Sequence, residues 1–190
     1  MKRLLICIFL YGLGCVNVVW AGDDSRDQDG HARVRFFGQA VIGLTFYKNK
    51  TCHGGHGVVA SKTGFGGVFS SKKNISLGIA ETPNVVNLKQ RDGILARAFY
   101  REYSVNAGEP LTISASFNDG TDHISYRCGP LDGYFIPEAG RDYEVALDIG
   151  NKICRLNVTQ IDSTEAEVRL LPVELSVAKS CSDKNNQENM

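Results

Sequence analysis

Between residues 94 and 178, short segments of alternating apolar and polar residues are separated by turn residues. The clearest segment is 110–117, where one face of an extended chain carries Leu111, Ile113, Ala115 and Phe117. Successive side chains of a strand point to opposite faces, so such a segment buries one face and leaves the other in water. One wet face per strand indicates antiparallel sheets. The pattern predicts an all-β protein, an antiparallel β-sandwich of the immunoglobulin-like type with about seven to nine strands.

The rest of the chain extends this prediction. Residues 33–47 are rich in β-branched and aromatic residues and predict one long strand, or two strands broken near Gly38 or Gly43. Asn118-Asp119-Gly120 predicts a hairpin turn. In 95–105 the aromatic residues favour a strand over a helix. Further strands are expected at residues 75–81, 123–128, 143–149, 153–161, 165–171 and 173–178.

Residues 48–74 are rich in glycine and serine and predict a long loop with one short strand near Val58-Val59. A loop of this length is uncommon inside a compact domain and is often functional. Its Phe65, Lys72 and Lys73 are candidate recognition residues.

The first 21 residues have the parts of a secretory signal peptide. Lys2 and Arg3 form the basic part, an apolar run follows, and small residues at the end of the segment predict cleavage after Ala21. One alternative is an uncleaved membrane anchor, but no basic stop-transfer cluster follows. The other is a lipoprotein lipidated at Cys15, but Gly12 stands where such signals usually carry Leu.

Cleavage predicts a periplasmic or secreted protein without a transmembrane span. We expect a flexible segment at 22–32, a single domain at 33–181 and a disordered tail at 182–190.

Four cysteines remain after cleavage, at positions 52, 128, 154 and 181. An even number of cysteines in an oxidising compartment predicts two disulfides. The chain has no CxxC pair, which would be the sign of a zinc site. The sequence leaves three pairings open. We favour Cys52–Cys128 and Cys154–Cys181.

The charge balance limits the classes of partner. The chain has 21 basic and 21 acidic residues, and loss of Lys2 and Arg3 leaves 19 against 21, a formal charge of −2. Nucleic-acid binding needs a basic surface, so this balance argues against it. An unknown protein or another envelope component is the expected partner.

Candidate chemistry is limited to histidines. His53 and His56 flank a Gly-Gly pair in the long loop and could hold a metal with a further ligand such as His123. The simpler interpretation is a pair of exposed histidines in a glycine-rich loop. The sequence lacks GxSxG, SxxK and HExxH motifs, so we assign no catalytic residue and expect no cofactor.

Residues 135–145 (FIPEAGRDYEV) resemble the segment formed by an aromatic residue, a turn and Ala-Gly-x-x-Tyr in small β-sandwich domains of bacterial envelope proteins, such as PEGA-type domains and related lipoproteins. The resemblance covers roughly residues 94–160 and implies an immunoglobulin-like sandwich with no catalytic residues. The chain is also similar to a group of uncharacterised secreted proteobacterial proteins, which implies no activity.

These observations predict an exported, non-catalytic binding or structural module of the bacterial cell envelope. Two alternatives stay open. One is a secreted hydrolase or metal-binding protein that uses His53, His56 and His123. The other is an inhibitor or accessory factor of the envelope.

Overall fold

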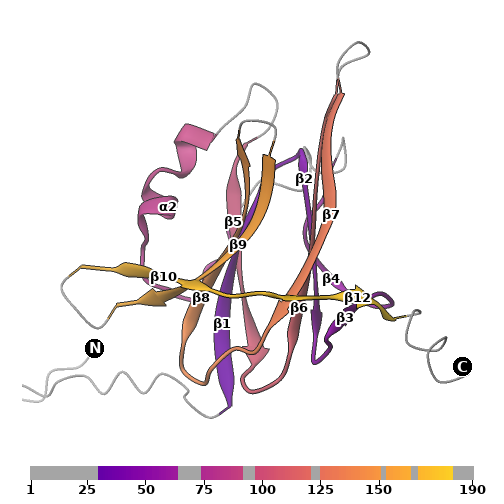
Figure 1. Ribbon diagram of the computed structural model, residues 1–190. Helices are drawn as coiled ribbons and strands as arrows, with labels where there is room; N and C mark the ends of the chain where they lie inside the picture. The colour runs from indigo at the N-terminus through magenta and orange to yellow at the C-terminus, as the bar shows by residue number, and fades with distance from the viewer. Residues whose placement is uncertain are drawn as a thin grey trace, which may run out of the picture.

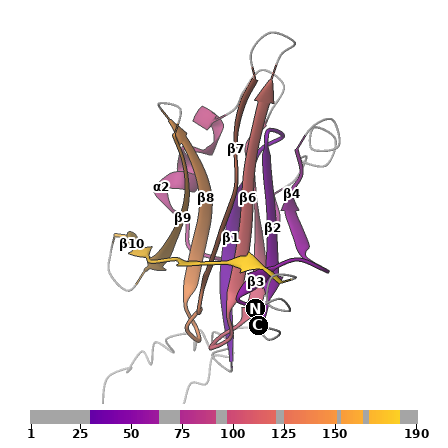
Figure 2. The same ribbon diagram turned by 45° about the vertical axis from the view of Figure 1, so that its right-hand side comes forward.

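The computed structural model describes residues 30–63, 74–91, 97–120, 125–150, 153–163 and 167–181. It consists mainly of two five-stranded sheets that face each other as a sandwich, as predicted (Figures 1 and 2). In spatial order the first sheet contains β10 (Arg169–Val173), β9 (Ile153–Asp162), β8 (Asp142–Gly150), β1 (His31–Gly38) and β5 (Phe99–Asn106). The second contains β11 (Ser176–Val177), β7 (Ser125–Phe135), β6 (Leu111–Gly120), β2 (Ile42–Lys48) and β4 (Val58–Ser61).

Two further strands, β3 (Cys52–His53) and β12 (Lys179–Ser180), form a separate parallel pair. Within the two large sheets every neighbouring pair is antiparallel except β1 and β8, which are parallel. The described residues thus form twelve strands, more than the seven to nine expected. The additional ones are short strands such as β3, β11 and β12, which are too brief to show alternation.

The core lies between the two sheets and follows the period of two. Phe36 of β1 stacks on Phe46 of β2 with ring centroids 4.7 Å apart, and Ile113 of β6 is fully buried beside them in the same cluster. The face predicted for residues 110–117 is confirmed, because all four of its apolar residues belong to this core. Ile149 of β8 is 37% exposed because it lies near the end of the strand.

Several elements of the structure differ from the predicted ones in their position or type. Residues 33–47 divide near Gly38 into β1 and β2, as expected. Residues 75–81 do not form the predicted strand and instead contribute one isolated bridge, from Ile75 to Arg101 of β5. They begin a strap, residues 74–91, that lies against the outer face of the first sheet and includes α2 (Pro83–Val86) and the 3-10 helix η1 (Leu88–Arg91).

The strand predicted for 95–105 is β5, which begins at Phe99. β6 and β7 form a hairpin as predicted, but Asn118-Asp119-Gly120 are not its turn: they belong to β6 and pair with residues 125–127 of β7, and residues 121–124 lie outside the described residues. β1 begins at His31, within the segment expected to be flexible, because it pairs with both β5 and β8. The signal segment and the tail at 182–190 also lie outside the described residues.

The segment that carries the family resemblance forms the corner between β7 and β8. The backbone N–H of Glu138 donates a hydrogen bond of 3.0 Å to the phenol oxygen of Tyr143. Burial raises the pKa of Tyr143 above its ordinary value. A tyrosine that bonds a backbone group a few residues upstream is a known device for holding the corner of a β-sandwich.

The C-terminal part, residues 169–181, forms a belt across the side of the sandwich (Figure 1). It pairs with β9 through β10, then with β7 through β11, and ends beside β3 through β12. Leu175, where the belt passes from one sheet to the other, lies close to Gly133 of β7. The belt therefore connects the edges of both sheets.

Two disulfides are present, as predicted, but the favoured pairing was wrong. Cys52 is bonded to Cys181, with Cα atoms 5.0 Å apart, and Cys128 is bonded to Cys154, with Cα atoms 6.1 Å apart. The physical reason is the path of the belt. It brings Cys181 beside β3, while Cys128 and Cys154 lie on β7 and β9, the two strands whose edges face each other across the sandwich.

Candidate functional site

Of the predicted histidines, the structure describes His53 and His56, and His53 lies beside a carboxylate. Its Nδ1 lies 3.7 Å from Oδ2 of Asp132 on β7, and the side chains are 29% and 11% exposed. Neither Nδ1 of His53 nor Oδ1 of Asp132, both buried atoms, has a hydrogen-bond partner among the described residues. His56 is exposed. The other predicted residues, Phe65, Lys72, Lys73 and His123, lie outside the described residues.

The strand positions beside Asp132 carry hydroxyl groups rather than metal ligands. Asp132 lies in register with Ser114 of β6, which lies in register with Thr45 of β2. Within the described part of the chain, no group of three His, Cys, Asp or Glu side chains could hold a metal ion. The metal site of His53, His56 and His123 therefore stays a prediction.

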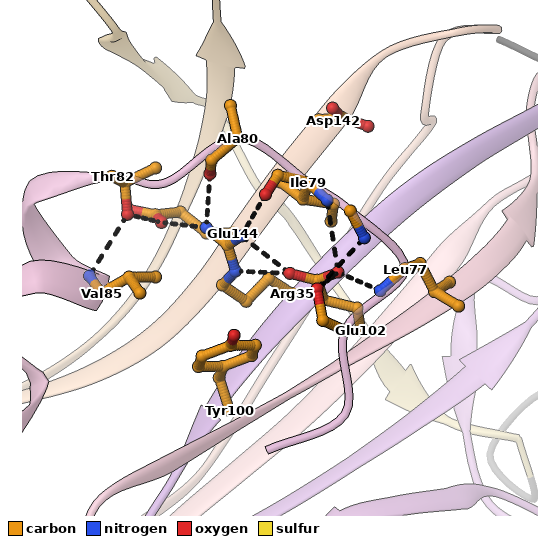
Figure 3. Close-up of polar contacts among 12 residues, drawn as sticks. Arg35, Leu77, Ile79, Ala80, Thr82, Val85, Tyr100, Glu102, Asp142 and Glu144 are labelled. Carbon is orange, nitrogen blue, oxygen red and sulfur yellow. Dashed lines mark hydrogen bonds and ion pairs between the residues drawn. The ribbon is translucent and has the colours of Figure 1, made fainter. Parts of the chain in front are cut away.

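The largest polar cluster was not predicted. It is a row of three side chains in direct register across the first sheet: Glu102 of β5, Arg35 of β1 and Glu144 of β8 (Figure 3). Each residue is 2% exposed. Arg35 donates from Nε and Nη2 to Oε1 of Glu102 at 2.9 and 2.7 Å, and its Nη1 lies 3.9 Å from Oε2 of Glu144. The ring of Tyr100 covers the guanidinium at 5.1 Å.

The same row holds the strap by its backbone. Arg35 donates to the carbonyl oxygens of Ile79 at 2.9 Å and Ala80 at 3.0 Å, and the second oxygen of Glu102 accepts from the N–H groups of Leu77 and Ile79. Oε2 of Glu144 accepts from the hydroxyl of Thr82 at 2.9 Å, the residue that caps α2 (Figure 3). The side chains of this row thus provide hydrogen-bond partners for backbone groups of the strap, which forms no regular strand pairing.

A second ion pair extends this arrangement toward solvent. Arg33 donates from Nε and Nη2 to the two carboxylate oxygens of Asp142, both at 2.7 Å, and from Nη1 to the carbonyl oxygen of Leu77. A bidentate pair of this kind fixes geometry as well as charge. Because the strap's backbone occupies these donors and acceptors, the cluster serves to position the strap rather than to bind a ligand.

A signal for this cluster was present in the sequence. Arg33 and Arg35 alternate with core residues in one strand, and Asp142 and Glu144 do so in another. Opposite charges at outward positions of neighbouring strands pair across a sheet. The sequence alone does not give the strand order, so the pairing could not be derived from it.

The side of the sandwich above the belt has open strand edges. β10 pairs with residues 158–162 of β9, whereas residues 153–157 pair with β8 and, among the described residues, with no strand on their other side. Ile153, at the start of this open edge, is 55% exposed. A groove of about 420 Å³ lies along it, between α2 and the belt.

The comparisons with known proteins found no family model, no curated protein and no solved structure that matches this chain. In the described residues, no helix is both long and apolar enough to cross a membrane. Candidate sites among the described residues include the edge of β9, the pair of His53 and Asp132, and the groove beside β9.

Proposed function

We propose that the protein is an exported, non-catalytic binding module of the bacterial cell envelope, periplasmic or secreted, whose partner is a protein or another envelope component. Its two disulfides indicate an oxidising, extracytoplasmic compartment. The basic and apolar parts of the first 21 residues support export by a signal peptide.

The observation that carries this proposal is the open edge of β9. Among the described residues, no strand pairs with residues 153–157 on the side away from β8, and an uncovered strand edge is a template for another chain. Two other parts of the sandwich are covered, since the strap lies on the outer face of the first sheet and the belt crosses the side. The edge of β9 belongs to a sandwich that carries two disulfides. Such an edge is suited to recognition, because the rigid scaffold keeps it in place.

The experiment that tests this function is site-specific photocrosslinking in the native envelope extract. A photoreactive phenylalanine replaces exposed Arg155 of β9, and a matched chain carries it at exposed Glu109 in the turn between β5 and β6. We expect a discrete adduct at position 155 and none at 109. Absence of adducts at position 155, or the same adducts at both positions, would contradict the proposal.

One observation favours a second candidate function, hydrolysis. A carboxylate hydrogen-bonded to Nδ1 of an imidazole orients a general base, and Oδ2 of Asp132 lies 3.7 Å from Nδ1 of His53, close to that arrangement but without the hydrogen bond. A hydrolase using this pair would lose activity on activated esters in a His53→Ala variant and keep it in a His56→Ala variant. Equal and background-level turnover in both variants and the parent chain would exclude this function.

A further inference from the structure

The strap at residues 74–91 lies on the first sheet with few apolar contacts. Among its described side chains the only buried hydrophobic residues are Ile79 and Leu88, and no residue of α2 is buried. Its strand pairing among the described residues is a single bridge, from Ile75 to Arg101 of β5. A segment with few buried apolar contacts opens at a lower free energy than the strands of a core. We therefore expect the strap to open while the sandwich stays folded.

The polar contacts beneath the strap do little to prevent this opening, because water replaces them when the strap leaves the sheet. Arg35, Glu102 and Glu144 are each 2% exposed and regain their hydration in the open state. Because this hydration offsets most of the lost contacts, buried ion pairs and their hydrogen bonds contribute little net stability. The row thus determines where the strap lies without adding much to the free energy of opening.

The contacts of the row also show what kind of molecule this face holds (Figure 3). Arg35 donates to the carbonyl oxygen of Ile79 at 2.9 Å, and Glu102 accepts from the N–H of Ile79 at 3.3 Å. Ile75 donates to the carbonyl oxygen of Tyr100 at 3.1 Å and accepts from the N–H of Glu102 at 2.9 Å. All these groups of the strap are main-chain groups, which every polypeptide carries. The face is therefore complementary to a polypeptide segment.

Two residues of the strap make this complementarity selective. Gly78 has φ +84°, a conformation that residues with a side chain rarely adopt. The hydroxyl of Thr82, a fully buried residue, donates to Oε2 of Glu144 at 2.9 Å. A segment without these two residues would be strained at the first position and would leave Glu144 without this donor at the second.

We propose that the strap is an autoinhibitory cover that opens as one unit, and that the open face binds a partner polypeptide with glycine in the place of Gly78 and threonine or serine in the place of Thr82. In the closed protein the row positions the strap, and in the open protein the same groups are available to the partner. The strap is tethered, so its high effective concentration keeps the face closed until a partner competes. The face is formed by β5, β1 and β8 rather than by the edge of β9, so this inference goes beyond the proposed function and does not depend on it.

Residue-resolved hydrogen exchange of the mature chain tests the opening. Leu88→Ser removes an apolar anchor of the strap and should accelerate exchange of the Ile79 amide at least about tenfold, because both residues belong to one opening unit. Val86→Ser is the matched control, since Val86 belongs to the same strap but is 66% exposed, and it should leave this rate unchanged. The same exchange rate of Ile79 in the parent and both variants would overturn the inference.

A core substitution separates opening of the strap from unfolding of the sandwich. Ile113→Val should accelerate exchange of the Val145 amide about threefold or more and leave the Ile79 amide unchanged, because opening of the strap does not disturb the core. Equal acceleration of both amides would mean that the strap and the sandwich open together, which would also overturn the inference.

A labelled peptide that copies residues 74–82 tests the occupant. We expect it to bind the Leu88→Ser chain at least about tenfold more tightly than the parent chain, in which the strap competes at full strength. Peptides with Gly78→Val or Thr82→Val should each bind about fivefold more weakly, the second because it lacks one hydrogen bond.

Absence of peptide binding to the Leu88→Ser chain, or equal binding of a peptide with the same residues in scrambled order, would overturn the inference. Photocrosslinking at position 155 tests the edge of β9 separately, so failure of the peptide leaves the proposed function in place.

Discussion

At the scale of single residues, Arg35 has the largest structural role among the buried polar groups. It forms four hydrogen bonds, two with Glu102 and two with backbone carbonyls of the strap, and lies near Glu144. Desolvation makes a buried ion pair a weak source of net stability, but removal of one partner leaves an uncompensated charge in the interior. The effect of a substitution should therefore be larger than the contribution of the pair itself.

The first prediction concerns this residue. Arg35→Met should lower the free energy of unfolding by about 3–5 kcal/mol, since Glu102 and Glu144 then lose their cation. Urea unfolding monitored by circular dichroism measures the change. Arg155→Met, an exposed site on β9, is the control and should change it by less than about 0.5 kcal/mol. Equal effects of the two substitutions would contradict the role of the buried row.

A second prediction at this scale concerns Tyr143. Tyr143→Phe removes the acceptor of the Glu138 N–H and should cost about 1 kcal/mol of stability. Because burial raises the pKa of Tyr143 in the folded state, its contribution is complete below the ordinary tyrosine pKa of about 10 and is lost as pH rises through the folded value. Unfolding curves between neutral and strongly alkaline pH should show a smaller alkaline loss in this variant than in Tyr134→Phe.

At the scale of elements, the strands were more predictable than their connections. The alternation in β6, β8 and β9 follows from burial of one face, and each was found close to its expected position. The strap was not predictable in the same way, because Ile79 and Leu88 are the only buried hydrophobic residues among its described side chains, and side chains of other strands hold its backbone. Local pattern carries no information about such distant partners.

The belt gives a prediction about the disulfides. The chain-entropy model makes the bond that closes the longer loop more stabilising. Cys52 and Cys181 are separated by 129 positions, and Cys128 and Cys154 by 26. We expect the variant with serine at 52 and 181 to lose about 5 kcal/mol and the variant with serine at 128 and 154 about 3.5 kcal/mol, measured by urea unfolding. A larger loss of unfolding free energy in the 128/154 variant than in the 52/181 variant would show that attachment of the belt by Cys181 contributes little to stability.

At the scale of the whole molecule, the sandwich could be predicted from the sequence, but the sites could not. Fold class follows from periodicity along the chain, whereas the pair of His53 and Asp132 depends on the path of the belt and the register between β6 and β7. The disulfide pairing failed for the same reason. Four cysteines predict two bonds, but only the positions of β3, β7, β9 and β12 decide which.

Export is a prediction about the whole chain. Intact-mass analysis of the native product should show a chain that begins after Ala21, and its four cysteines should resist alkylation until the protein is reduced. Retention of the first 21 residues together with four reactive thiols would exclude both the compartment and the proposed extracytoplasmic partner.

The open edge of β9 is the claim on which the proposed function depends, and residue-resolved hydrogen exchange of the free mature chain tests it most directly. Among amides that point away from β8, those of residues 153–157 should exchange rapidly, while those of residues 158–162 should be protected by β10. Equal protection of both halves of β9 would mean that another segment already covers the edge, and it would contradict the account.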